Sequence, residues 1–258
     1  MSDALSILLT NDDGIDAPGL EAVRERLAAD HDVTVVAPAG QRSGSGQTRT
    51  MGPVSYDEHD RGYAVKGTPA DCVAVGLAGI GLNPDIVVSG CNDGPNVGAH
   101  VLGRSGTVGA AMEAGFLDLP AVAVSMYDWA LAEEDWEPAR EKFGVAADVA
   151  ADLVPRFAAG DVLPSADYLS VNAPASDIAD DPVRRVTRPS EEYELEATMT
   201  ESGVNVDDRY WREFLARDVP DPKGTDRRVC VDNEVSVTPL TAPHSVPGDV
   251  TPGGLLEP

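Results

Sequence analysis

The chain has 258 residues, 42% hydrophobic and 24% charged, a balance typical of globular proteins and not of disordered, collagen-like or coiled-coil chains. Its length fits one extended α/β domain, or one domain with an appendage. The 44 acidic and 19 basic residues give a net charge of -25, so the chain lacks the clustered cations that nucleic acid polymers and anionic membranes require. We therefore expect neither of these partners.

The sequence also predicts the salt environment and the cellular location of the protein. The acidic residues are scattered along the chain, and only three of the basic residues are lysines. This composition resembles that of halophilic proteins, in which salt screens a solvated acidic surface. No apolar run approaches the ~20 residues that span a bilayer, and the N-terminal sequence is acidic where a signal peptide is basic. We expect a cytoplasmic protein.

The cysteines and histidines predict neither a disulfide framework nor a zinc ribbon, because no two of them have the spacing of a metal or disulfide motif. We interpret the histidines as structural or solvated. The residues concerned are Cys72, Cys91, Cys230, His31, His59, His100 and His244.

The first part of the chain is predicted to begin with a strand, a helix and a second strand. The apolar run at 5–10 suits a strand buried on both faces of a parallel sheet. Leu20, Val23 and Leu27 then form one apolar stripe at helical spacing. Residues 33–37 give the second strand, which a proline ends.

The next segments are predicted to be a hairpin, a capped helix and a strand. Residues 47–66 contain β-prone segments around glycine and proline, typical of a hairpin. In GTPADCVAVGLAGI, Thr68 and Asp71 have the spacing of a capping box, and Pro69 occupies the first helical position. The run at 85–90 is the next strand.

The alternation continues to residue 173. We expect helices at 105–116 and 139–157, and strands at 121–125 and 168–173. Repeated strands and helices in this order indicate a mostly parallel sheet with right-handed crossovers and flanking helices.

The pattern changes at about residue 188. Alternating apolar and polar residues around Leu195 and Met199, the turn signal SGVN and then DRYWREFL predict a two-stranded arm. The later sequence VCVDNEVSVTPL returns to strand character.

Polar residues follow three of these strands, at the edge where open α/β sheets bind ligands. Asp12 and Asp13 follow the first strand, Ser43 the second, and Asn92 the run at 85–90. Adjacent carboxylates repel each other, so their joint use indicates a turning backbone, which Gly14 permits, and a cation between them. Hard oxygen ligands suit Mg²⁺ or Mn²⁺. The alternative, that the two acids only cap the following helix, stays open.

Other interpretations of this loop can be compared by spacing. An EF-hand places its glycine further along, and the chain contains neither a dinucleotide fingerprint nor a Walker loop. A phospho-receiver switch also carries an acidic pair, but it needs an aspartate where this chain has Asn92. The receiver and a nucleotide-binding protein without turnover remain the alternatives to an enzyme.

A second candidate site is an anion site at the predicted start of the helix at 105–116. Small residues at the start of a helix leave backbone N–H groups exposed at the positive end of its dipole. The guanidinium group of an arginine there could add charged hydrogen-bond donors. In the alternative, a serine caps the helix and the glycines only allow close packing. The candidate phosphate-binding residues here are Arg104, Ser105, Gly106 and Thr107.

The chain resembles a known family through several strings in one order. They are ILLTNDDGIDAPGL, VVAPAGQRSGSG, GTPADCV, PDIVVSGCNDGPNVG, SGTVGAAMEA and VSVTPL. Together they look like the SurE survival-protein family of 5′/3′-nucleotidases, which implies a metal-dependent phosphatase acting on nucleoside monophosphates. It also implies a Rossmann-like catalytic core at 1–187. Residues 188–258 would then form a β-hairpin arm and a C-terminal extension exchanged within a homodimer or tetramer, and not an independent domain.

The resemblance also implies roles for single residues. One divalent ion per subunit, Mg²⁺ or Mn²⁺, would be held by Asp12, Asp13, Ser43 and Asn92, and Asn96 would line the phosphate site beside the segment at 104–107. The chemistry of the residues themselves agrees with these roles, since Asp12 or Asp13 could act in catalysis, either as a base toward water or as a nucleophile. Asp93 and Arg104 depart from the family pattern, which leaves substrate preference open.

Overall fold

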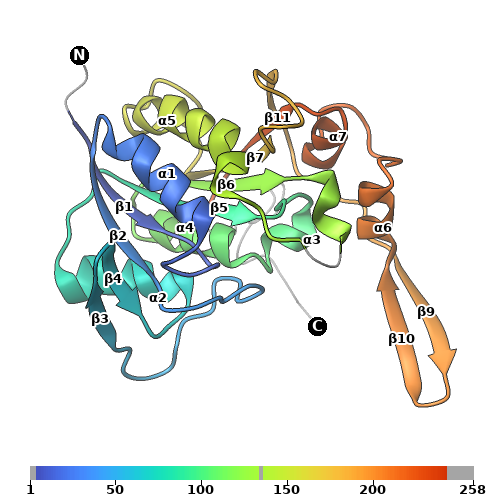
Figure 1. Ribbon diagram of the computed structural model, residues 1–258, viewed down its shortest axis with the longest axis horizontal. Helices are drawn as coiled ribbons and strands as arrows, with labels where there is room; N and C mark the ends of the chain where they lie inside the picture. Colours follow the sequence, from blue (N-terminus) through green and yellow to red (C-terminus); the bar gives the residue numbers. More distant parts are fainter. Residues whose placement is uncertain (1–3, 134–135, 243–258) are drawn as a thin grey trace, which may run out of the picture.

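The computed structural model describes residues 4–133 and 136–242, and it confirms the predicted α/β fold with a mostly parallel sheet (Figure 1). The strands are β1 (Ser6–Thr10), β2 (Asp32–Pro38), β3 (Tyr56–His59), β4 (Gly62–Val65), β5 (Ile86–Asp93), β6 (Ala121–Tyr127), β7 (Tyr168–Pro174), β8 (Arg184–Val186), β9 (Leu195–Thr200), β10 (Gly203–Asp208) and β11 (Val235–Leu240). The α-helices are α1 (Pro18–Ala28), α2 (Pro69–Ala74), α3 (Ala99–Leu102), α4 (Gly106–Phe116), α5 (Gly144–Ala158), α6 (Arg209–Leu215) and α7 (Asp226–Val231).

The main sheet has nine strands in the order β3-β4-β2-β1-β5-β6-β7-β11-β8. Five neighbouring strands of this sheet pair in parallel, as the alternation of strands and helices predicts. In sheet order they are β2, β1, β5, β6 and β7. Two antiparallel pairs flank them. One is the predicted hairpin, found as β3 and β4, and the other joins β11 to β7.

The core lies on both faces of this sheet because successive strand residues point to opposite sides. Ile7 and Leu9 of β1 pack with α1 and α5 in one hydrophobic cluster. Leu8, between them, packs with α2 and α4 in the other. Figure 1 shows α1 and α5 together on one side of the sheet.

The predicted capping box begins α2. The Thr68 hydroxyl accepts from the backbone N–H of Asp71 at 3.1 Å, and the Asp71 carboxylate accepts from the backbone N–H of Thr68 at 2.9 Å. The predicted single helix to residue 80 is wrong in one respect, because the last part, Val75–Ile80, winds as a π-helix. There the backbone of Gly76 lies so close to β1 that an added Cβ would lie 2.5 Å from the Leu8 Cδ1.

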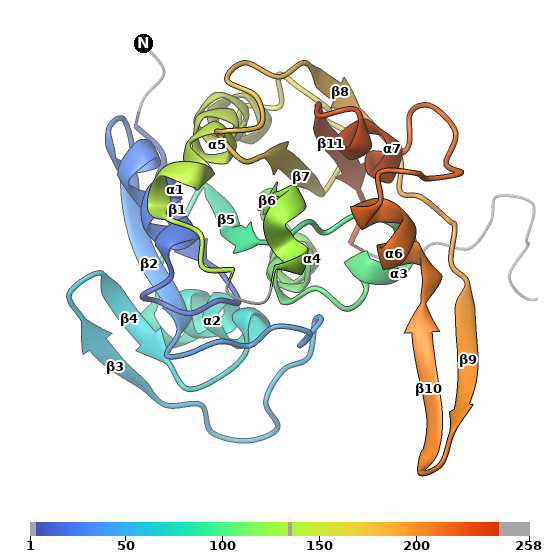
Figure 2. The ribbon, with the colours of Figure 1, turned by 45° about the vertical axis from the view of Figure 1, so that its right-hand side comes forward.

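Two predictions for the last third need correction. The arm consists of β9 and β10, which pair antiparallel and project from the sheet (Figure 2), whereas most of DRYWREFL forms α6. Tyr210 and Phe214, four residues apart, bury one face of α6 in a third hydrophobic cluster. Likewise VCV ends α7 and is not a strand, so β11 begins only at Val235.

The structure also adds detail to the predicted ends of elements. The helix predicted at 139–157 begins with a 3₁₀ turn, Arg140–Phe143, before α5. The three cysteines are free and buried. The division at residue 187 and the role of 188–258 in oligomerisation stay predictions, and the expected C-terminal extension beyond residue 242 lies outside the described residues. No helix in the described ranges is long and apolar enough to cross a membrane.

The acidic surface predicted from composition is present. Within the described part of the chain, all but six acidic side chains are at least partly exposed. The six are Asp12, Asp71, Glu113, Asp128, Asp221 and Asp226. With a net charge of -25, the exposed carboxylates repel one another across the surface.

We expect folding to require salt, because a Debye length of ~3 Å at 1 M salt screens this repulsion and one of ~10 Å at 0.1 M does not. The native far-UV circular dichroism signal should be complete at molar KCl and decline toward low salt. A full signal below about 0.1 M KCl would show that the surface repulsion is unimportant.

Candidate active site

A tight turn places the two adjacent aspartates beyond the end of β1. The Asn11 side chain closes the turn, donating to the Gly14 carbonyl at 2.9 Å and accepting from the Gly14 N–H at 3.2 Å. Gly14 has a φ of 105°, and a Cβ there would lie 3.2 Å from the backbone of Gly40. A glycine is therefore required where the β1 loop meets the β2 loop.

Asp12 lies buried against the start of α4. Its carboxylate accepts a hydrogen bond from the Thr107 hydroxyl, and a Cβ added at Gly106 would lie 2.8 Å from its Oδ2 atom. Burial raises the pKa of Asp12, while the hydroxyl of Thr107 and the backbone amides of Gly106 and Thr107 act in the opposite direction. The positive end of α4 thus faces this carboxylate.

Asp13 points toward a different neighbour. Its Oδ2 atom accepts from the backbone N–H of Asp93 at 3.1 Å. Burial, with the charge of Asp12 as the second cause, raises the pKa of Asp13 to about 7. Within residues 4–133 and 136–242, no lysine, arginine or histidine forms an ion pair with either aspartate. The adjacent acids therefore carry a repulsion that the described side chains leave unneutralised.

Asn92 lies at the same edge of the sheet as the two aspartates, just after a shift in strand register. The pairing of β5 with β6 shifts between Ser89 and Asn92, and a Cβ at Gly90 would lie 2.2 Å from the Val124 carbonyl oxygen. The Asn92 amide nitrogen donates to the Gly94 carbonyl at 2.6 Å. This bond orients the side chain and leaves its carbonyl oxygen as an acceptor for the site.

Asn96 is held rigidly by the ends of β6 and β7. Its side-chain nitrogen donates to the Ser125 hydroxyl at 2.9 Å. Its backbone N–H and carbonyl bond to the Asn172 side chain at 2.7 and 3.1 Å. The side-chain amide of this buried residue therefore has a fixed position beside the loop.

The segment entering α4 shows the geometry of the helix-cap alternative. The Ser105 hydroxyl accepts from the Val108 N–H at 3.1 Å and so caps the helix. Thr107 is fully buried and donates to Asp12. Both hydroxyls thus have protein partners, and a phosphate role for them stays a prediction.

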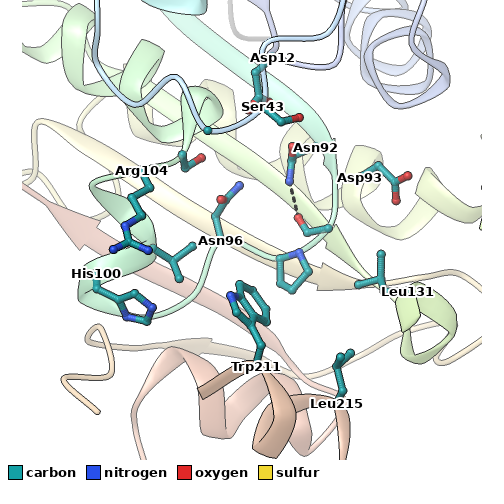
Figure 3. Close-up of a pocket in the computed structure, with 15 residues that line it drawn as sticks. Asp12, Ser43, Asn92, Asp93, Asn96, His100, Arg104, Leu131, Trp211 and Leu215 are labelled. Carbon is teal, nitrogen blue, oxygen red and sulfur yellow. Dashed lines mark hydrogen bonds between the residues drawn. The ribbon is translucent and has the colours of Figure 1, made fainter. Parts of the chain in front are cut away.

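A cleft of about 450 Å³ joins several of these residues (Figure 3). Asp13 lines a neighbouring cleft of about 410 Å³ with Asp93 and Trp136, whose indole donates to Asp93 at 3.0 Å. Gly106 and Thr107 line neither cleft. Of the residues predicted for the site, the larger cleft is lined by Asp12, Ser43, Asn92, Asn96, Arg104 and Ser105.

Several residues that line this cleft were not predicted. Trp211 and Leu215 come from α6, Leu131 from the 3₁₀ turn Trp129–Ala132, and His100 from α3. His100 stacks on Tyr193, with ring centroids 4.2 Å apart. A signal for α6 was available in DRYWREFL, whose aromatic residues recur at helical spacing.

The oxygen-rich edge has the donor chemistry of a magnesium or manganese site. The described residues contain no group of three His, Cys, Asp or Glu side chains placed to hold a metal. The candidate set instead combines two carboxylates with hydroxyl and amide oxygens, which are hard neutral ligands. The Ser45 hydroxyl is buried without a hydrogen-bond partner in the described part of the chain, on the side of Gly106 that faces Asp12.

Comparison with known proteins gives one consistent family. Residues 7–196 match the model of Survival protein SurE. The chain is 49% identical over 246 residues to the 5′-nucleotidase SurE of Halobacterium salinarum, covering 95% of this chain and 94% of the relative. Identity to the Natronomonas pharaonis 5′-nucleotidase SurE is 45% over 255 residues, covering 98% and 99%. The crystal structure of a SurE protein from Aquifex aeolicus matches with a TM-score of 0.76 and 32% identity, covering 93% and 94% of the two chains. The chain therefore belongs to the SurE family, as the sequence predicts.

Proposed function

We propose that this chain is a metal-dependent 5′/3′-nucleotidase that hydrolyses nucleoside monophosphates to nucleoside and phosphate. The observation that carries the proposal is the meeting of three distant loops at one sheet edge, where Asp12 lines one cleft with Ser43 and Asn92, and its neighbour Asp13 lines the adjoining cleft. The names of its relatives, each a 5′-nucleotidase SurE, support the same activity.

The metal would be one Mg²⁺ or Mn²⁺ ion per subunit, held by Asp12, Asp13, Ser43 and Asn92. The donor set fits such an ion, because the carboxylates supply negative charge and the hydroxyl and amide supply neutral oxygens. When bound, the ion would polarise a phosphoryl oxygen and lower the pKa of a water molecule.

The chain's own residues then position the phosphate. Asn96, fixed by its bonds to Ser125 and Asn172, has a second side-chain N–H that would donate to a phosphate oxygen, and the guanidinium of Arg104 offers charged donors at the same cleft. The start of α4 acts indirectly, because the Thr107 hydroxyl and the backbone amides of Gly106 and Thr107 hold the Asp12 carboxylate in place.

One of the two aspartates carries the chemical step in this proposal. As a general base, Asp12 or Asp13 would accept a proton from water. As a nucleophile, it would attack the phosphorus and displace the nucleoside, forming an aspartyl-phosphate that water then hydrolyses to phosphate and the free carboxylate. The receiver alternative is disfavoured, because a receiver needs an aspartate where this chain has the neutral amide of Asn92.

We also propose that the protein forms a homodimer or tetramer in which the arm, β9 and β10, contacts another subunit. The strands β9 and β10 expose large apolar side chains, with Met199 78% and Val206 57% accessible. Apolar surface of this kind on a projecting hairpin is typical of a protein interface.

The metal proposal predicts loss of activity with a chelator and recovery with Mn²⁺ or Mg²⁺. Asp13→Asn should mimic the chelator and lower kcat/KM for AMP by at least about 100-fold, or ~2.7 kcal/mol. The amide can still accept from the Asp93 N–H, so the variant removes mainly the charge. Phosphate release from AMP, in high salt, is the measurement.

Asp16→Asn is the matched control, since this carboxylate in the same loop is 78% exposed and pairs with Arg61. It should leave turnover unchanged. Undiminished turnover and metal affinity in Asp13→Asn would show instead that the acidic pair only stabilises the loop.

Metal affinity should depend on pH, because a ligand carboxylate must be deprotonated to bind. With the pKa of Asp13 raised to about 7, the proton competes below neutrality. The Kd for Mn²⁺, measured calorimetrically, should be constant above about pH 8 and weaken by up to about tenfold per unit below pH 7. In Asp13→Asn this slope should flatten. An unchanged Kd from pH 5.5 to 8 would contradict the assignment.

The neutrality of Asn92 gives another prediction. Asn92→Asp would add a third charged ligand, so metal should bind as tightly or more tightly while the field at the phosphate becomes less positive. We expect kcat/KM to fall at least about tenfold, or ~1.4 kcal/mol.

Asn92→Ala is the comparison, because both variants lose the bond to the Gly94 carbonyl and differ in charge. The alanine variant should bind metal weakly and recover partly with added Mn²⁺, whereas the aspartate variant should not. If both kept the wild-type metal affinity and turnover, Asn92 would be only a loop residue.

A further inference from the structure

The cleft extends well beyond the edge proposed to hold metal and phosphate. Asp12, Ser43 and Asn92 lie on one side of it, and Trp211 and Leu215 lie on the other (Figure 3). Pro95 and Leu131 add apolar surface to the lining of the cleft. A volume of about 450 Å³ falls within the range of small-molecule sites, so the cleft has room for a whole mononucleotide.

The far side of the cleft is built around an aromatic ring. Trp211 and Leu215 lie four residues apart on α6, so they share one face of the helix. Both are half-buried, whereas Tyr210 and Phe214 are buried beneath them in the third hydrophobic cluster. The Trp211 ring is nearly perpendicular to those of Tyr210 and Phe214, at 87° and 82°. The indole is therefore braced from below in its position at the cleft.

The same helix is tied to the loop that carries Asn96. The Tyr210 hydroxyl donates to the Val97 carbonyl at 2.7 Å. The next residue, Gly98, donates its N–H to Asp226 at 2.7 Å, and a Cβ there would lie 2.2 Å from the Tyr210 hydroxyl. The distance between the proposed phosphate position and the Trp211 ring is thus set by direct contacts before any ligand binds.

We infer that Trp211 is the stacking platform for the base of the nucleotide, and that it makes the enzyme prefer nucleotides over other phosphate monoesters. This inference rests on the proposed function. An aromatic ring stacks with any base through its π face, so the platform selects for the presence of a base and only weakly for its identity. Leu131 and Leu215 would cover the edges of the base with apolar surface.

The test compares AMP with ribose 5-phosphate, which has the same sugar and phosphate but no base. Stacking on an aromatic side chain is worth roughly a 5- to 150-fold change in affinity per base. In Trp211→Ala, kcat/KM for AMP should fall by about this factor, whereas kcat/KM for ribose 5-phosphate should change less than about twofold. Trp211→Phe should retain most of the preference for AMP. Trp211→Leu, which keeps apolar volume without a ring, should lose it.

Arg212→Ala is the matched control, because Arg212 lies on the exposed side of α6 and pairs with Glu196 of the arm. It should leave both substrates unaffected, and circular dichroism should show the wild-type fold in every variant. Equal losses for AMP and ribose 5-phosphate in Trp211→Ala, or no loss for either, would overturn the platform.

Adenosine binding, measured calorimetrically, separates this inference from the proposed function. Wild-type protein should bind adenosine, and Trp211→Ala should bind it more weakly by the same factor as for AMP. If the wild type released no phosphate from either ester, the proposed function would be wrong, yet adenosine binding lost in Trp211→Ala would still support the platform. Equal adenosine affinity in the two proteins would refute it.

Discussion

The main electrostatic constraint on the proposed site is the repulsion between two neighbouring carboxylates, Asp12 and Asp13, that are partly buried. The groups around them must offset this repulsion. Burial raises the pKa of Asp12 and Asp13, and the charge of Asp12 adds to the effect on Asp13. The chain surrounds them with partial positive charges: the Thr107 hydroxyl, the Asp93 N–H and the start of α4. These dipoles only partly offset the cost of the two negative charges, because the pKa of both groups stays raised, and a divalent cation between them would supply the missing positive charge.

The parallel sheet explains how such distant residues meet. Because β2, β1 and β5 are neighbours in one parallel sheet, the loops that follow them lie side by side at one edge. Glycines then allow the loops and α4 to approach closely. A Cβ at Gly109 would lie 2.2 Å from the Gly46 carbonyl, and a Cβ at Gly106 would lie against Asp12. The site is therefore assembled by backbone contacts that side chains would prevent.

The parts that sequence reasoning predicts correctly are those whose signals are local. The buried strands are continuous apolar runs, and the capping box of Thr68 and Asp71 lies within four consecutive residues. The helix α6 was predicted as part of the arm because its aromatic residues directly follow an alternating strand, and this context outweighed their helical spacing. The partners of its buried face, Val97 and Tyr127, lie more than eighty residues earlier. The hydrogen bond from the Asp93 N–H to the Asp13 carboxylate could not be predicted either, because it depends on how the Gly14 turn packs against the end of β5.

The central claim is that these loops form one binding site for a divalent cation. Crystals soaked in Mn²⁺, with anomalous scattering recorded at the manganese edge, test it most directly. We predict one strong peak per subunit, within bonding distance of oxygen atoms from Asp12, Asp13, Ser43 and Asn92. Ordered Mn²⁺ elsewhere on the acidic surface, with no peak between the two aspartates, would contradict the account.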